Sequence, residues 1–98
     1  MEPLRYFLDT HDVANGTFPA GLTPEQFKDF YKGYKAACFE EGVVPITVHL
    51  GYDEGRAFCL TMAPSAEAVE RAHKRAGLPF HEITEVKLAK VGDTFSCC

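Results

Sequence analysis

The chain has 98 residues, which fits one small domain and leaves no room for two. Hydrophobic residues make up 46% of it, a proportion typical of globular proteins. Its formal net charge of -4 argues against nucleic acid and against an anionic membrane surface as partners. A domain of this size buries only about two-thirds of the surface of its unfolded chain, so dimerisation would stabilise it.

No part of the chain approaches the roughly 18 consecutive apolar residues that a membrane span needs. The start, Met1-Glu2-Pro3-Leu4, lacks the basic and apolar blocks of a signal peptide. We therefore expect a cytoplasmic protein with reduced cysteines. Residues 1–98 are expected to form one domain, with an ordered core over about 3–90 and a polar tail over 91–98. Adjacent thiols such as Cys97-Cys98 can bind a soft metal or be prenylated, or they can simply end a disordered tail.

The first half of the chain predicts a strand, a loop and a long helix. β-forming residues alternate weakly over 4–9, whereas 10–22 contains glycine and proline without a period. Thr23 and Gln26 can form a capping box at the start of a helix, and Gly42 can end it. Apolar side chains repeat every three or four residues along one face, which predicts a buried stripe: Phe27, Phe30, Tyr31, Tyr34 and Cys38.

The second half predicts a hairpin, a shorter helix and a last strand. Strands are expected over 44–52 and 56–62, joined by a three-residue loop that ends in glycine. Ser65 caps a helix that ends at Gly77, and a strand follows over 83–90. This order predicts an α+β fold, the ferredoxin-like βαββαβ sandwich, in which a four-stranded antiparallel sheet carries two helices on one face.

Because two helices cover only one side of the sheet, the opposite face is expected to be open and to be the working surface. Side chains alternate between the faces of a strand, so each residue can be assigned to one of them. The set expected under the helices is Ile46, Val48, Leu50, Phe58, Leu60 and Met62. The mixed, polar set expected on the open face is Arg5, Phe7, Asp9, Thr47, His49, Ala57, Cys59, Thr61, Ile83, Glu85 and Lys87.

The strongest chemical feature of this predicted face is a histidine beside a cysteine. A three-residue hairpin loop places His49 opposite Cys59, with Cβ atoms about 4.5–5.5 Å apart. Imidazole and thiolate at this distance can share one soft or borderline divalent metal ion. Asp9 and Glu85 on the same face are further candidate ligands. His73, on the second helix, can join only past the sheet edge or from a second subunit.

Structural interpretations of the same residues stay open. Cys59, in a predicted central strand, can simply be a small buried hydrophobic residue. His49 can be a histidine whose hydrogen bonds are satisfied in an interface. His73 fits a helix-edge residue, whereas His11 and His81 fall in predicted loops and are expected to be solvated. The motifs HExxH, CxxC, GxGxxG and the P-loop are absent from the sequence, which excludes the enzyme classes that they mark.

Several segments together carry a resemblance to a known family. They are Val48-His49 with Cys59 ten residues later, Ala63-Pro64-Ser65, Ala68, His73, Gly77, Pro79 and Ile83-Thr84-Glu85-Val86. Over roughly residues 3–90 the chain resembles a small bacterial family, long described as a domain of unknown function and named for a nickel-responsive, nickel-binding member.

The resemblance implies a ferredoxin-like fold, a dimer and metal binding, as reported for one member. His49, Cys59, His73 and Glu85 match the family pattern and carry ligand atoms. The longer loop over 10–22, the additional His81 and the Cys97-Cys98 end depart from that pattern.

Three functions are compatible with these observations. The first is a small metal-binding protein that buffers or senses nickel, or else zinc or copper, through His49, Cys59, His73, Glu85 and Asp9. The second is a cofactor-free enzyme with His49, Cys59 and Asp9 around an apolar pocket of roughly 300 Å³ or more. The third is an open face that only forms a homodimer. The resemblance favours metal binding by a homodimer, with no catalytic residue.

Overall fold

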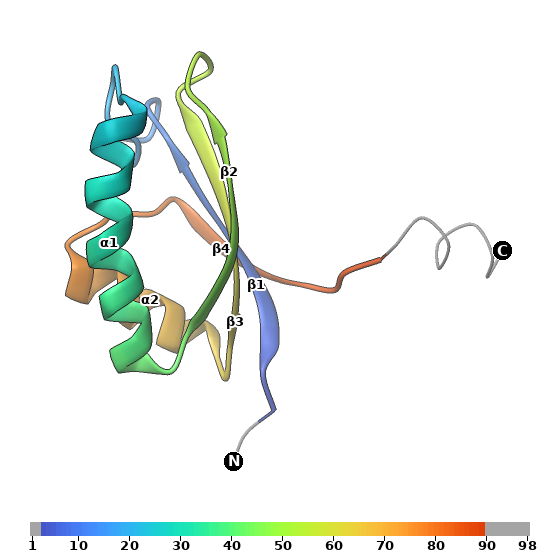
Figure 1. Cartoon of the computed structure of the whole chain (residues 1–98). Helices are drawn as coiled ribbons and strands as arrows, with labels where there is room; N and C mark the ends of the chain where they lie inside the picture. The colour runs from blue at the N-terminus through green and yellow to red at the C-terminus, as the bar shows by residue number, and fades with distance from the viewer. Residues whose placement is uncertain (1–2, 90–98) are drawn as a thin grey trace, which may run out of the picture.

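The elements of the structure follow the predicted order. The structure is a computed structural model, and it describes residues 3–89. Its elements are β1 (Arg5–Asp12), α1 (Pro24–Glu41), β2 (Val44–Gly51), β3 (Arg56–Ala63), α2 (Ala66–Ala76) and β4 (Glu82–Val86). The strands form one antiparallel sheet in the order β2-β3-β1-β4, and both helices lie on the same side of it (Figure 1). This confirms the ferredoxin-like βαββαβ sandwich. The predicted tail over 91–98, with Cys97 and Cys98, lies outside the described residues.

Both helices begin and end at the residues that the sequence predicts. The Thr23 hydroxyl accepts a hydrogen bond from the Gln26 amide, and the Gln26 side chain accepts one from the Thr23 amide, which completes the capping box of α1. Gly42 ends α1 with φ 72°, a left-handed conformation that glycine adopts without strain. The Ser65 hydroxyl caps α2 by accepting a hydrogen bond from the Ala68 amide, and a cap of this kind stabilises its helix by about 1 kcal/mol. Within residues 3–89, neither helix is long and apolar enough to cross a membrane.

The hydrophobic core lies between the helices and the sheet and is built around Phe7, which is 2% exposed. Three alanines where α2 meets the sheet, Ala63, Ala68 and Ala72, are fully buried. Their small side chains allow the helix backbone to approach the strands closely. The other buried members of this core are Tyr34, Cys38, Val43 and Val69.

The sheet faces of β1, β3 and β4 are the reverse of those predicted. Phe7 and Asp9 of β1 are buried under the helices, as are Ala57, Cys59 and Thr61 of β3. The larger apolar residues of the central strands lie half-buried on the open face: Tyr6, Leu8, Phe58, Leu60 and Met62. The prediction of a polar open face is therefore wrong, because the open face is apolar and the polar groups lie inside.

The physical reason is the length of the hairpin loop. The loop between β2 and β3 has four residues, 52–55, and not three. Val48 is consequently the partner of Cys59, and His49 is the partner of Phe58, so the predicted His49–Cys59 pair does not form. Since side chains alternate with every residue, one additional loop residue moves a whole set of partners to the other face.

Two strands also differ from the prediction in length. β1 continues to Asp12, three residues into the segment predicted as a loop, and His11 consequently belongs to the sheet. The amide of His81 donates a hydrogen bond to the Thr10 carbonyl at 2.8 Å, which holds the chain entering β4 against β1. β4 ends at Val86, four residues before the predicted end of that strand.

Candidate metal centre and adjoining cavity

Three ligand-type side chains meet between the sheet and α2. Asp9 and His11 come from β1, and His73 comes from α2; their ligand atoms all lie within 4.8 Å of one another. The Nε2 atom of His11 is 2.7 Å from Asp9 Oδ1, and the Nε2 atom of His73 is 3.2 Å from the same oxygen. Asp9 is 0% exposed and His73 is 1% exposed. We refer to these three residues as the Asp9 cluster.

The positions of the cluster residues follow from the periods of their elements. Phe7, Asp9 and His11 are each two residues apart in β1, so all three point to the helix-covered face. His73 follows Val69 by four residues on the buried stripe of α2. Packing that stripe on the middle of β1 places an imidazole directly beside the carboxylate.

Both imidazole rings are oriented by backbone carbonyls. His11 Nδ1 lies 2.8 Å from the Pro79 carbonyl oxygen, and His73 Nδ1 lies 2.8 Å from that of Val69. A carbonyl oxygen only accepts hydrogen bonds, so each Nδ1 carries a proton and each Nε2 is directed at Asp9. At these distances a proton or a metal ion lies between Asp9 Oδ1 and each Nε2, because otherwise lone pairs would face one another. One metal ion can meet this requirement, as can protons on the rings or on the carboxyl.

The electrostatics of the cluster agree with this description. Burial raises the pKa of Asp9, but hydrogen bonds with His11 and His73 outweigh burial, so the net pKa of this carboxyl is lowered. Burial lowers the pKa of His11, and here the hydrogen bond and charge of Asp9 outweigh it, so the net pKa is raised. Both shifts favour the charged forms. Asp9 Oδ2 is buried without a hydrogen-bond partner in the described part of the chain.

The structure brings some of the predicted ligands together and separates others. Asp9 and His73 belong to the cluster, and Cys59 lies directly opposite Asp9 in the neighbouring strand. Burial, and then the charge of Asp9, raise the pKa of the Cys59 thiol, so it stays protonated at neutral pH. His49 is exposed on the other face of the sheet, where its ring lies 3.1 Å from the Thr47 hydroxyl.

Glu85 also lies apart from the cluster. Its carboxylate forms an ion pair with Arg5 at 3.0 Å, and both side chains are about half exposed. Conversely, the sequence interpretation missed His11, which was expected to be a solvated loop residue. The signal that could have located it is the alternation Phe7, Asp9, His11, which continues past the predicted end of the first strand.

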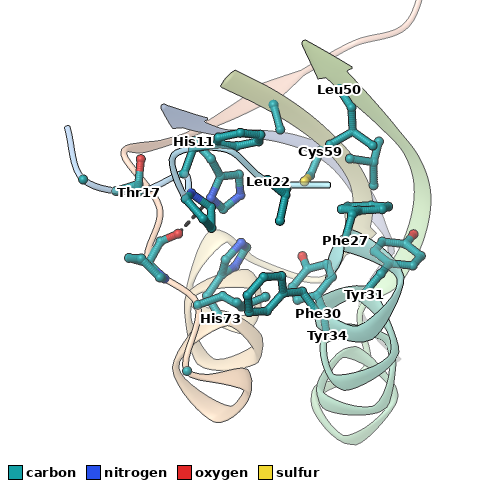
Figure 2. Close-up of a pocket in the computed structure, with 18 residues that line it drawn as sticks. His11, Thr17, Leu22, Phe27, Phe30, Tyr31, Tyr34, Leu50, Cys59 and His73 are labelled. Carbon is teal, nitrogen blue, oxygen red and sulfur yellow. Dashed lines mark hydrogen bonds between the residues drawn. The ribbon is translucent and has the colours of Figure 1, made fainter. Parts of the chain in front are cut away.

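A cavity of about 280 Å³ adjoins the cluster, between α1, the segment after β1 and the sheet (Figure 2). His11 and His73 form part of its wall, together with Cys59, while most of the other lining side chains are aromatic or aliphatic. The enzyme hypothesis predicted an apolar cavity of roughly 300 Å³ or more with His49, Cys59 and Asp9 around it. Of these three, Cys59 lines the cavity, Asp9 is in contact with the lining residues His11 and His73, and His49 lies on the opposite face of the sheet.

The fold and the cluster define a class: a small ferredoxin-like protein with a buried carboxylate and two imidazoles that can hold a divalent metal ion. The profile of the family described as nickel-responsive protein SCO4226-like matches residues 7–86. The chain therefore belongs to this family, which confirms the resemblance noted in the sequence.

A solved structure agrees with this assignment. The crystal structure of SCO4226 from Streptomyces coelicolor A3(2) is 34% identical in sequence and superposes with a TM-score of 0.75. The match covers 87% of this chain and 99% of that chain. A comparison with curated proteins gives no match.

Proposed function

We propose that this protein binds a divalent metal ion, nickel in the first instance, through Asp9, His11 and His73, and that it buffers or senses the ion. The observation that carries this proposal is the convergence of three ligand atoms within 4.8 Å of one another under the helices. The family is described as nickel responsive, which supports nickel over other ions that the same donors accept.

The donor set suits this chemistry. Imidazole nitrogen with carboxylate oxygen is a favourable combination for nickel, zinc and copper. The carbonyls of Val69 and Pro79 hold the two rings as the outer shell of a metal site does, with Nε2 directed at the ion. An arriving dication would replace ring protons, so metal uptake and proton release are coupled. Cys59 can join as a ligand only after losing its proton, which its raised pKa opposes until the metal is close.

The test is a calorimetric titration of the untagged, chelator-treated protein with Ni²⁺, Zn²⁺ and Cu²⁺. The parent should bind about one ion per chain, and His11→Ala should weaken binding by at least about 100-fold, since a direct ligand matters more than an outer-shell group. His49→Ala is the matched control, because it removes the same side chain from the open face. If His11→Ala remains folded by circular dichroism and binds Ni²⁺ as tightly as the parent, the proposed site is wrong.

We also propose that the protein is a homodimer that pairs through the open face of its sheet. Two features support this. The central strands expose large apolar side chains there, with Leu8 opposite Leu60 and Tyr6 opposite Met62. A chain of 98 residues also buries a modest share of its own surface, so a second copy is an effective cover.

A further inference from the structure

The cavity beside the Asp9 cluster has the size and the walls of a small-molecule site. Its volume of about 280 Å³ is close to twice the roughly 150 Å³ of an apolar cavity that holds one benzene molecule. It has room for one ring with a short substituent. Apolar residues from distant parts of the chain form most of its walls: Phe18, Leu22, Phe27, Phe30, Leu50 and Leu78.

One buried polar group in the wall has no satisfactory partner. The Tyr34 side chain is 3% exposed, and its hydroxyl makes no hydrogen bond among the described residues. The Cys38 thiol lies nearby, but a thiol is a weak hydrogen-bonding group. Figure 2 shows the hydroxyl directed into the ring of lining side chains, near His73 and Leu22. A buried hydroxyl without a partner costs about 1–3 kcal/mol, which a ligand oxygen could recover.

Three of the other polar side chains that line the cavity, His11, Thr17 and His73, are already engaged. The Nδ1 atoms of His11 and His73 face backbone carbonyls, and their Nε2 atoms face Asp9. The Thr17 hydroxyl donates to the Asp12 carbonyl and accepts from the Asp12 amide. Of the remaining polar groups, Cys59 carries a thiol, which is a weak hydrogen-bonding group, and Tyr31 is only partly buried. The Tyr34 hydroxyl is therefore the buried group best suited to recognise a ligand, and burial raises its pKa, so it remains a neutral donor.

The surroundings also specify the charge of the ligand. An ionised group without a fixed counter-charge is expensive to bury in an apolar cavity. The positive charge on the histidine side of the cavity is already paired with Asp9, so it is not a free counter-charge for a carboxylate. A neutral oxygen does not meet this penalty.

We propose that this cavity binds a neutral ring compound, a phenol or a ketone, whose oxygen accepts a hydrogen bond from the Tyr34 hydroxyl. The ring occupies the space between Leu22 and the aromatic face of α1, and its edge lies against His11 and His73. This inference goes beyond metal binding and requires no metal ion.

The experiment compares three probes of similar size: 4-ethylphenol, ethylbenzene and 4-ethylbenzoate. Each is titrated into isotope-labelled parent protein in the presence of a chelator, and binding is followed by NMR shifts of the residues that line the cavity. The parent should bind 4-ethylphenol at one site, about 2- to 10-fold more tightly than ethylbenzene, and 4-ethylbenzoate least well. This ratio corresponds to the net value of one neutral hydrogen bond.

Tyr34→Phe is the decisive variant because it removes only the unpartnered hydroxyl and should leave the fold intact. It should bind 4-ethylphenol and ethylbenzene equally well. Tyr31→Phe is the matched control: its hydroxyl points away from the centre of the cavity in Figure 2, and the preference should persist. The proposal is overturned if the parent binds neither ring compound, if Tyr34→Phe keeps the preference, or if 4-ethylbenzoate binds best.

The ring-compound titrations and the separate metal titration together distinguish this inference from the proposed function. A parent that binds Ni²⁺ but neither ring compound contradicts the cavity proposal and leaves metal binding intact. A parent that binds 4-ethylphenol but no metal ion supports the cavity proposal and contradicts the metal site.

Discussion

The two faces of the sheet hold the reverse of what each would hold in a simple sandwich. The helix-covered face buries a carboxylate and two histidines at its centre, next to Phe7. The open face presents a continuous group of large apolar side chains, with Leu8 and Leu60 in the middle. Burying ionisable groups is unfavourable unless they are paired, and exposing apolar surface is unfavourable unless it is covered. The ionisable groups of the Asp9 cluster pair with one another. The apolar open face would be covered by the proposed partner subunit.

This difference supports the two proposals, metal binding under the helices and assembly through the open face. Burying a charged cluster costs desolvation free energy, and such clusters are often found at functional sites. A binding role would therefore explain why this protein has one. A broad face whose centre is apolar fits an interface instead. Four experiments test this division of roles between the two faces.

The largest expected effect is on stability, from neighbouring residues of β1 that point to opposite faces. Phe7→Ala should lower the free energy of unfolding by about 3–5 kcal/mol, because the phenyl ring is fully enclosed and leaves a cavity. Leu8→Ala, on the half-buried open face, should cost about 1 kcal/mol in the isolated subunit. Urea unfolding at low protein concentration measures both values. Equal losses would show that the two faces are not packed differently.

The second effect is on metal affinity. Asp9→Asn keeps the shape of the side chain but removes its charge, and the affinity for Ni²⁺ should fall by about 100-fold, which is about 2.7 kcal/mol. Glu85→Gln is the control, since it removes a carboxylate from the same face where it is exposed and paired with Arg5. Equilibrium dialysis with metal analysis measures both. A larger loss in Glu85→Gln than in Asp9→Asn would move the site to the edge strand.

The third effect is on assembly. Leu60→Asp places a charge in the middle of the apolar open face, and a dimer that buries this face should dissociate to monomers at micromolar concentration. Lys28→Asp, on the exposed side of α1, should leave the dimer unchanged. Light scattering coupled to size exclusion gives the mass of each. A parent that is monomeric under these conditions would remove the proposed interface.

The smallest effect is a pH dependence of stability in the metal-free protein. The pKa of His11 is raised above its ordinary 6.5, so its interaction with Asp9 stabilises the fold fully below about pH 6.5 and is lost as pH rises through the raised value. The pKa of Asp9 is lowered below 3.8, so its contribution is complete above about pH 4 and is lost on acidification. Stability should therefore be greatest between about pH 4 and 6.5.

Thermal unfolding across pH measures this window, and His11→Gln should flatten its alkaline side. His81→Gln, which changes an exposed histidine, should leave the profile as it is in the parent. A parent whose stability rises steadily from pH 6 to pH 8 would contradict the raised pKa of His11.

Part of this site could be predicted from the sequence, and part could not. Asp9 and His73 were both among the predicted ligands, yet they were placed on different sides of the sheet. The error came from the hairpin: with one residue more in the loop, Cys59 faces Val48 and the whole of β3 reverses. His11 was missed because strand ends are poorly marked in a sequence, and β1 extends to Asp12.

Local signals in the sequence determined the order of the elements, both helices and the family, because caps, turns and periodic apolar positions act over a few residues. Thr23, Gly42, Ser65 and Gly77 bound the helices as predicted for this reason. Only the tertiary structure established which faces of β1, β3 and β4 are buried. That choice depends on loop length and on how closely α2 can approach the sheet, and the small residue Ala63 together with the alanines of α2 favours the face that also carries Asp9. The Asp9 cluster exists only because packing joins β1 to a helix more than sixty residues further along the chain.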